Sequence, residues 1–259
     1  MNTSDDSSQF TVELRAMLYY NLGNDIVTYT TDRTIGRDGA KIKHELCAEG
    51  ARFFYPHQVH TDRIYRIDET FLTLDAPQQK ELLEGIDAVM TDIPQVILGI
   101  STADCIPVVV YDPEHHAAAA IHAGWKGTVL RIVEKAIDEM AKIYGTKPEQ
   151  CTAAIGPGIS QESFEVGTEV LDQFCNAGFQ MDDVTQWMPN TKVGEQPAMK
   201  PHIDLKEVNR LQLTGKGIKE QNITVSPIDT FTDERFFSAR REQKGTVKCG
   251  RILTGFMLK

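Results

Sequence analysis

The sequence has no long uninterrupted apolar run and no leader of basic residues followed by an apolar core. Its most hydrophobic stretch, "PQVILGISTADCIPVVVYD", contains Asp104 and Pro107, which excludes one membrane-spanning helix there. The start, "MNTSDDSSQF", is acidic and serine-rich, unlike a secretory signal. We therefore expect a cytoplasmic protein with no membrane partner, a disordered tail at residues 1–9 and one globular domain at residues 10–259.

Cysteine is scarce and forms no CxxC motif. The five cysteines are an odd number and lie far apart, which argues against a disulfide framework and favours reduced thiols. Basic residues are also a minority, because 27 lysines and arginines against 37 acidic residues give a formal charge of −10. This charge repels nucleic acid at long range, so we expect no nucleic-acid partner, although a local basic pocket can still bind a small anion.

Short apolar segments alternate with amphipathic ones along the chain. Four apolar segments within residues 87–124 predict the central strands of one sheet covered on both faces, and residues 52–67 predict one further strand. From Gly127 the apolar residues recur at three- and four-residue steps until Gly145, which predicts a helix. The polar residues 183–200 have no clear period and predict a surface loop or lid. Other predicted elements are strands at residues 25–33, 151–159, 222–230 and 250–258 and helices at residues 40–50, 167–178 and 204–217.

Three residues with metal-ligand chemistry lie at the ends of predicted strands: His60 in "HQVHTD", Cys105 in "STADC" and His122 in "IHAGWKG". If the sheet forms as predicted, they converge at one edge, and two imidazoles with a thiolate suit Zn²⁺ with a fourth position open. No HExxH or CxxC motif brackets them, so two alternatives stay open: hydrogen-bonded structural histidines and a small buried cysteine. The neighbouring Asp104 either orients a ligand histidine or caps a turn.

Several long motifs occur in a fixed order: "QVH", "DAVMTD", "TADCIPVVVYD", "AAIHAGWKGT", "AAIGPGIS", "DLKEVNRLQL", and "FFSARRE" followed by "GR". From about Asp25 to the C-terminus they resemble the laccase-domain family, also described as multicopper polyphenol oxidase-like and as purine nucleoside phosphorylases. The resemblance implies a single-domain α/β sandwich with mixed β-sheets flanked by helices. It also implies that His60, Cys105 and His122 bind one zinc ion and that residues 10–259 form a laccase-domain-like catalytic domain.

The same resemblance implies an enzyme that phosphorolyses adenosine, inosine and methylthioadenosine and deaminates adenosine. Its partners would be purine nucleosides and phosphate. Three positions depart from the family pattern: Lys126 replaces an arginine, Asp229 a cysteine and Ala239 a tyrosine. Lysine keeps the charge of arginine but loses its bidentate geometry, which changes how this chain would hold an anion.

Counting ligands excludes a true multicopper mechanism of phenol oxidation within one subunit. Such an enzyme needs two histidines and a cysteine at one copper, plus further histidines, on the order of eight, for a trinuclear cluster. The chain has seven histidines and no HxH motif. A copper-dependent, laccase-like polyphenol oxidase activity would therefore require copper to take the zinc site, where Cu²⁺ outcompetes Zn²⁺.

Candidate residues for the nucleoside reactions follow from their chemistry. Deamination needs water activated by zinc and a carboxylic acid that shuttles a proton, for which Asp104 and Asp229 are candidates. Phosphorolysis needs cations that hold phosphate. The candidates are Lys126, Arg240 and Arg241, each with a solvated or charged-turn alternative.

Two side chains near the predicted ligands are candidates for the purine. Trp125 offers a flat face for stacking, although core packing is its alternative. Gln58 lies two residues before His60. On the strand predicted there, His57 points to the opposite face and is the weaker candidate.

A metal-free cysteine hydrolase is the main alternative, with Cys105 as nucleophile and His122 or His60 as base. Peptidoglycan precursor editing, a role associated with bacterial members of the family, is one setting for such an activity. A third alternative is a protein that binds partners without catalysis. This alternative is disfavoured, because it leaves the set of cysteine and histidines without a function. We expect a monomer.

Overall fold

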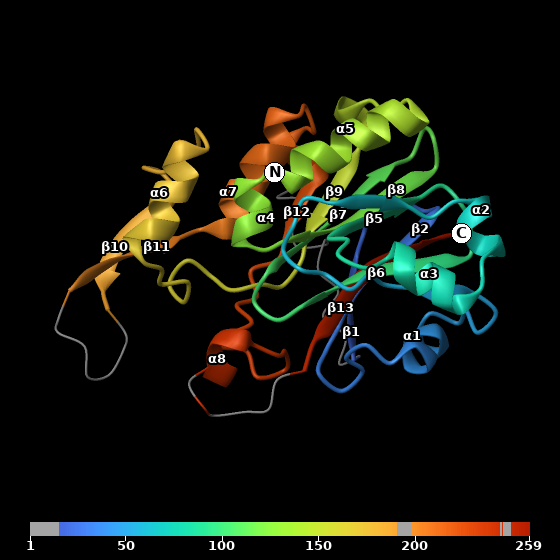
Figure 1. The fold of residues 1–259 in the computed structure, drawn as a ribbon, viewed down its shortest axis with the longest axis horizontal. Coiled ribbons are helices and arrows are strands. Elements are labelled where there is room, and N and C mark those ends of the chain that lie inside the picture. Colours follow the sequence, from blue (N-terminus) through green and yellow to red (C-terminus); the bar gives the residue numbers. More distant parts are fainter. Residues whose placement is uncertain (1–15, 191–197, 244, 246–249) are drawn as a thin grey trace, which may run out of the picture.

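The computed structural model describes residues 16–190, 198–243, 245 and 250–259. Two β-sheets pack face to face and helices cover their outer faces (Figure 1), so the predicted α/β class with mixed sheets flanked by helices is confirmed. The predicted tail of residues 1–9 lies outside the described residues.

The larger sheet has six strands in the order β12-β9-β7-β8-β5-β4. Its centre is antiparallel, since β7 pairs antiparallel with both β8 and β9, and its two edge strands pair in parallel with their neighbours. Every residue of β7 and β8 is buried, which accounts for their continuous apolar sequence. The strands are β4 (Ile64–Arg66), β5 (Ala88–Thr91), β7 (Ile106–Asp112), β8 (Ala117–Ala123), β9 (Thr152–Ile155) and β12 (Ile223–Val225).

The smaller sheet has five strands in the order β1-β2-β13-β6-β3. The C-terminal strand lies between β2 and β6 and is antiparallel to both, while the edge strand β3 runs parallel to β6. The strands are β1 (Met17–Tyr20), β2 (Ile26–Thr31), β3 (Arg52–Phe54), β6 (Val96–Thr102) and β13 (Ile252–Leu258).

Apolar side chains fill three layers. Between the sheets, Leu98 and Ile100 of β6 belong to one cluster with Val109 and Tyr111 of β7. The outer face of the six-stranded sheet packs against α5 (Ile132–Tyr144) and α7 (Leu205–Gly215). The outer face of the five-stranded sheet packs against α1 (Gly39–Glu45) through Ile42. Alternate residues of each strand thus serve opposite layers.

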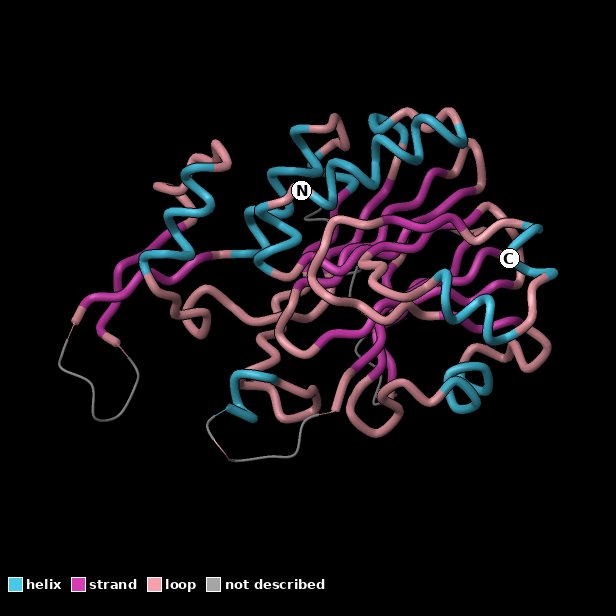
Figure 2. Tube along the Cα trace, in the orientation of Figure 1, coloured by secondary structure: helices cyan, strands magenta, loops and turns pink. Residues whose placement is uncertain are grey.

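The predicted amphipathic helix after Gly127 is confirmed but divided in two. A short helix is followed by Arg131 at a φ of 60°, and the main helix ends at Gly145 with a φ of 80°, a left-handed conformation that glycine adopts at little cost. Figure 2 shows this helix pair as two successive coils. The helices are α1 (Gly39–Glu45), α2 (Glu69–Thr73), α3 (Ala76–Leu82), α4 (Trp125–Val129), α5 (Ile132–Tyr144), α6 (Thr168–Asn176), α7 (Leu205–Gly215) and α8 (Ala239–Gln243), with 3-10 turns η1 (Pro148–Gln150) and η2 (Glu220–Asn222).

Three predictions about strands were wrong. Residues 52–67 form two short strands in different sheets, with a loop between them that carries His60. The four apolar segments of residues 87–124 are likewise shared between two sheets, because β6 pairs with β13 whereas β5, β7 and β8 pair with one another. Alternation within a strand cannot show which sheet it joins.

The third wrong prediction is a loop or lid at residues 183–200. Strand β10 (Thr185–Pro189) pairs antiparallel with β11 (Met199–Ile203), and the two form a separate ribbon beside α6 (Figure 1). Residues 191–197 lie outside the described part of the chain. The ribbon is only partly buried, which explains its lack of apolar periodicity.

No helix in the described ranges is long and apolar enough to cross a membrane. The four cysteines within those ranges, Cys47, Cys105, Cys151 and Cys175, are free thiols, as the odd and scattered set predicted.

Candidate metal centre

His60, Cys105 and His122 come together as predicted, at one end of the two sheets. Their ligand atoms all lie within 4.8 Å of one another. The Cys105 Sγ lies 3.7 Å from His60 Nε2, and the two imidazole rings meet edge to face at 4.9 Å between centroids. His122 is the penultimate residue of β8, Cys105 precedes β7, and His60 lies in the loop between β3 and β4. Two imidazoles and one thiol thus face a common point.

Asp87, just before β5, fixes this arrangement. Its fully buried carboxylate accepts a hydrogen bond from His122 Nδ1 at 2.7 Å. It also accepts from the successive backbone N–H groups of Val59, His60 and Thr61 at 2.8–3.2 Å. One side chain therefore sets the orientation of one ligand histidine and the backbone position of the other.

The hydrogen bond from His122 to Asp87 also fixes the tautomer of the ring. With the proton on Nδ1, the lone pair of Nε2 points toward the Cys105 side of the site, as in a metal-ligating histidine held by a carboxylate. Asp104 was the residue considered for this role from the sequence, with a turn cap as its alternative, and Asp87 was missed. The available signal was the carboxylate at the start of the fully buried strand in "DAVMTD", since a buried carboxylate needs partners.

The loop that carries His60 has an unusual backbone, with a φ of 63° at His60. Gln58 stabilises the same loop: its amide donates to the Ser101 carbonyl at 2.9 Å and accepts from the Ser101 N–H at 2.7 Å. A non-glycine residue in the left-handed region persists only where its surroundings hold it. The contacts of Asp87 and Gln58 supply that restraint.

The space in front of the donors suits an ion. A Cβ added at Gly124 would lie 2.9 Å from Cys105 Sγ and 3.0 Å from His60 Cδ2, so the gap exists because residue 124 has no side chain. Nitrogen and sulfur donors in a set of three, with a further side open, are the ligand type of a catalytic zinc site. The residues present therefore fit a metal ion.

Electrostatics favour the metal-binding form of the thiol. Burial raises the pKa of Cys105, but the neighbouring His122 and His60 outweigh it and lower the pKa to about 6. For His122, burial lowers the pKa, whereas Cys105 and Asp87 raise it to about 9. For Asp87 itself, burial acts to raise the pKa, yet the bonds from His122 and Thr61 bring it to about 2. Without a bound metal ion, a thiolate next to a charged imidazole is thus the stable state at neutral pH. A metal ion that binds there would displace the proton from His122 Nε2 and leave the proton on Nδ1.

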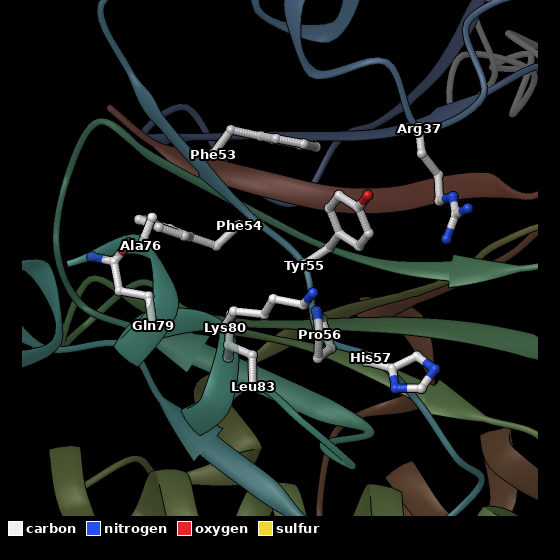
Figure 3. A pocket seen from close by; sticks show the side chains of 10 residues that line it. All are labelled: Arg37, Phe53, Phe54, Tyr55, Pro56, His57, Ala76, Gln79, Lys80 and Leu83. Carbon is white, nitrogen blue, oxygen red and sulfur yellow. The ribbon is translucent and has the colours of Figure 1, made fainter. Parts of the chain in front are cut away.

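The donors open into a cavity of about 540 Å³. Besides the three donors, its wall is formed by residues of five segments of the chain: Arg37, Pro56, His57, Gln58, Ser101, Thr102, Ala103, Ala239, Gly250 and Arg251. A second pocket of about 340 Å³ shares Arg37, Pro56 and His57 with it and is lined by Phe53, Phe54 and Tyr55 (Figure 3). The volume of the first cavity lies within the range of about 300–1,000 Å³ that small-molecule sites occupy.

Asp104 does not orient a ligand histidine, which corrects the first of its two predicted roles. Its carboxylate accepts hydrogen bonds from Thr230 Oγ1 at 2.7 Å, from Ser238 Oγ at 2.9 Å and from the Arg240 N–H at 2.7 Å. These bonds attach the segment before and within α8 to the loop that holds Cys105. The role of Asp104 is therefore closer to its second predicted role, a cap. The segment that it caps, before and within α8, is distant from Asp104 in the sequence.

Asp229 holds another loop. Its carboxylate accepts from the Ser163 hydroxyl at 2.6 Å and from the N–H groups of Ser160 and Phe231 at 3.2 and 2.9 Å. Burial acts to raise its pKa, but these bonds lower it on balance. Asp229 is not among the residues that line the cavity of the donors.

The predicted phosphate ligands Arg240 and Arg241 lie outside that lining as well. Arg240 donates to the carbonyls of Ser163 and Glu165 at 3.2 and 3.1 Å, and Arg241 donates to the carbonyl of Phe231 at 2.9 Å. Their guanidinium groups connect loops, and among the residues that the structure describes, the arginines that line the cavity are Arg37 and Arg251 instead.

Trp125 and Lys126 begin α4, directly after Gly124. Trp125 is partly buried and packs against the main core, as its alternative interpretation held. Lys126 is exposed, with its Nζ 5.6 Å from the Trp125 ring centroid. Neither lines the cavity, whereas Gln58 and His57 both do.

The fold and the donor set together define an α/β protein with a His–Cys–His group that could bind a metal ion. The chain belongs to the family described as multi-copper polyphenol oxidoreductase laccase, whose model matches residues 20–259. The resemblance found in the sequence motifs is thereby confirmed.

Two relatives are named for purine chemistry. The chain is 43% identical over 204 residues to a purine nucleoside phosphorylase of Bacteroides thetaiotaomicron, covering 78% of this chain and 72% of that protein. It is 38% identical over 205 residues to adenosine deaminase RL5 of an unknown prokaryotic organism, covering 79% and 74%. Among solved structures, the hypothetical protein YfiH of Bacillus licheniformis superposes with a TM-score of 0.82 at 26% identity, over 97% of this chain and 100% of that chain.

Proposed function

We propose that the protein is a zinc-dependent purine nucleoside enzyme that phosphorolyses adenosine, inosine and methylthioadenosine and deaminates adenosine. The observation that carries the proposal is the convergence of His60, Cys105 and His122 at an open cavity. Two relatives named for these reactions, at 43% and 38% identity, support it.

The three donors would hold the ion, and zinc there would supply Lewis acidity and lower the pKa of water. The residues of the chain do the remaining work. Asp87 keeps the proton on His122 Nδ1, which leaves Nε2 free to ligate, and it holds the His60 loop in place. Gly124 keeps the approach to the donors open.

In phosphorolysis the bond between C1′ of the ribose and the purine nitrogen breaks, a C1′–O bond to phosphate forms, and the purine takes a proton. In deamination, water replaces the amino group at C6 and ammonia leaves. Each reaction needs a proton donor near the cavity. His57 lines the cavity with its Nδ1 2.5 Å from Glu84 Oε1, so His57 is a better placed shuttle than Asp104 or Asp229.

The test is a product assay on adenosine with and without phosphate. We expect adenine and ribose 1-phosphate only with phosphate, inosine without it, and the loss of both in Cys105→Ala. Cys175→Ala is the matched control, because Cys175 is an exposed free thiol on α6, and it should keep both products. Full turnover by Cys105→Ala would overturn the proposal.

The geometry also favours one second candidate, a metal-free cysteine hydrolase of the kind that could edit peptidoglycan precursors. Cys105, His122 and Asp87 are arranged as a nucleophile, a base and the carboxylate that orients the base. This candidate requires that chelator-treated protein hydrolyse an amide substrate and lose that activity when Cys105 is alkylated. The zinc proposal requires the opposite response to chelation.

Copper in the same site is the remaining variant of the proposal, since Cu²⁺ outcompetes Zn²⁺ at nitrogen and sulfur ligands. Phenol oxidation that appears only after copper loading, and disappears in Cys105→Ala, would support it. The variants Cys105→Ala and Cys175→Ala thus test the copper activity as well as the zinc activity.

A further inference from the structure

The short helix α4 lies against the segments that carry the three donors. A Cβ added at Gly127, inside the helix, would lie 3.3 Å from the carbonyl oxygens of His122 and of Thr61, the residue after one donor histidine. A Cβ added at Gly124, directly before the helix, would lie 2.9 Å from Cys105 Sγ. The position of α4 therefore decides how closely these segments approach one another.

Helix α4 cannot hold this position by itself. It has five residues, and no side chain of the described residues caps its first turn. Isolated helices shorter than about 12–15 residues are at best marginally stable in water, so tertiary contacts must fix this one. Helix α7, which packs beside it (Figure 1), supplies such contacts.

Thr128 connects the two helices. Its hydroxyl oxygen accepts from Asn209 Nδ2 at 3.1 Å, which directs the hydroxyl proton to the carbonyl of Gly124, at 3.1 Å, or of Ala123, at 3.3 Å. The carbonyl of Thr128 accepts from Gln212 Nε2 at 3.1 Å. A chain of hydrogen bonds thus runs from α7 to the backbone that follows the donor histidine of β8.

The two amides of α7 stand where packing alone would favour apolar side chains. Thr128 and Asn209 are fully buried and Gln212 is 3% exposed, and the amides share the buried face of α7 with Val208 and Leu213. A buried amide costs free energy unless it is hydrogen-bonded, and Gln212 Oε1 has no partner among the described residues. The amides therefore serve a fixed arrangement of α4 and α7 more than stability.

We propose that Asn209 and Gln212 are positioning residues of the metal centre, which act through Thr128 and hold Gly124 and the end of β8 against the other donors. The inference rests on the proposed function, because it presupposes a metal ion at the donors. Neither amide needs to touch the ion or a substrate. The metal affinity, and not only the stability of the fold, should therefore depend on them.

Cobalt(II) provides the test, because its visible absorption reports both the affinity and the arrangement of its ligands. Chelator-treated protein is titrated with Co²⁺ alone. Thr128→Val keeps the side-chain volume and removes the hydroxyl, whereas Thr128→Ser keeps the hydroxyl and removes a methyl group. We expect Thr128→Val to weaken Co²⁺ binding by about tenfold and to shift the absorption bands at saturation, and Thr128→Ser to keep the wild-type affinity and bands.

The amides are tested in the same way. Asn209→Leu and Gln212→Met remove the amide groups at similar side-chain volume, and each should weaken Co²⁺ binding by about tenfold. Asn222→Leu is the matched control, because Asn222 Nδ2 donates to the Cys151 carbonyl at 3.1 Å, beside the end of β7 that lies away from the donors. It should bind Co²⁺ as wild type does. Urea unfolding of the metal-free proteins measures the stability separately.

The proposal is wrong if Thr128→Val and Thr128→Ser have the same Co²⁺ affinity and spectrum, or if Asn209→Leu binds Co²⁺ as Asn222→Leu does. Its failure is separable from that of the proposed function. Purine products in variants that bind Co²⁺ like wild type would remove the positioning role and keep the function. Co²⁺ binding that is weakened in Thr128→Val and Asn209→Leu, with no purine product from the wild type, would keep the positioning role and remove the function.

Discussion

Asp87 Oδ1 lies 2.7 Å from His122 Nδ1, and the same carboxylate accepts the N–H of His60 at 3.0 Å. One buried acid therefore connects two of the three metal donors, which come from segments more than sixty residues apart in the sequence. Because Asp87 is itself fixed directly before β5, the six-stranded sheet sets the geometry of the candidate metal centre.

The first prediction concerns this acid. Asp87→Asn should lower the affinity for zinc by about 10–100-fold, as the loss of a carboxylate behind a ligand histidine does. It should also lower the free energy of unfolding by about 2–4 kcal/mol, because buried donors lose an ionised acceptor. Competition with a chromogenic chelator and urea unfolding measure the two effects.

Asp92→Asn is the matched control, since Asp92 ends the same "DAVMTD" motif. Its pair with Arg66, at 3.3 Å, is partly exposed, so the change should cost less than about 1 kcal/mol. Zinc affinity in Asp87→Asn equal to that of Asp92→Asn would show that Asp87 does not orient the site.

The second prediction concerns the space in front of the donors. Gly124→Ala should lower zinc affinity at least tenfold, because the new Cβ would lie within 3.0 Å of Cys105 Sγ and His60 Cδ2. The backbone of Gly124, with a φ of −65°, accepts alanine without strain. Gly50→Ala, where an added Cβ meets no atom within 4 Å, should bind zinc normally; an equal effect in both variants contradicts the account.

The third prediction is a pH dependence of stability that originates outside the metal centre. Burial lowers the pKa of Lys206 to about 8, while its Nζ donates to the carbonyls of Ser226 and Ile228. The unfolded chain, with an ordinary lysine pKa, then binds more protons between about pH 8 and pH 10, so stability rises with pH in this window.

The rise between pH 8 and pH 10 should be about 2 kcal/mol and should be missing in Lys206→Met, which cannot titrate. Urea unfolding of both proteins at pH 8 and pH 10 gives the comparison, because other titrating groups are common to the two. Parallel pH profiles would mean that the ammonium is not desolvated in the folded protein.

The fourth prediction distinguishes an arginine that connects loops from an arginine that binds an anion. Arg240→Gln removes donors to the carbonyls of Ser163 and Glu165 and should cost about 1–2 kcal/mol of stability. The KM for phosphate should stay within about twofold of wild type, since a lost charged phosphate contact would cost far more. A tenfold rise in that KM would return Arg240 to the phosphate site.

The candidate metal donors were predictable from the sequence because each has distinctive chemistry. Cys105 and His122 also lie next to or within the recognisable strands β7 and β8, whereas His60 lies in a loop. Helix α5 was predictable for a similar reason, since Ile132, Val133, Ala136, Ile137 and Met140 are all buried on one face. Asp87 was missed because its partners, the Val59–Thr61 backbone and His122, are brought to it only by the sheet.

The cations of the cavity were missed for the same reason. Arg37 lies in a polar loop before α1 and Arg251 just before β13, and nothing local marks either as part of the cavity wall. Arg240 and Arg241 stand together in a conspicuous motif, yet their donors serve backbone carbonyls. Charge in a sequence shows the number of cations, while the fold decides which of them face a cavity.

The most direct test of the central claim is the metal content of tag-free protein by mass spectrometry, measured in wild type, Cys105→Ala and Cys175→Ala together with their purine products. The account predicts about one zinc per chain with adenine or inosine formed in wild type and Cys175→Ala, and the loss of both metal and product in Cys105→Ala. Protein without bound metal that still forms a purine product, or whose Cys105 is an alkylatable nucleophile of a hydrolase, would contradict it.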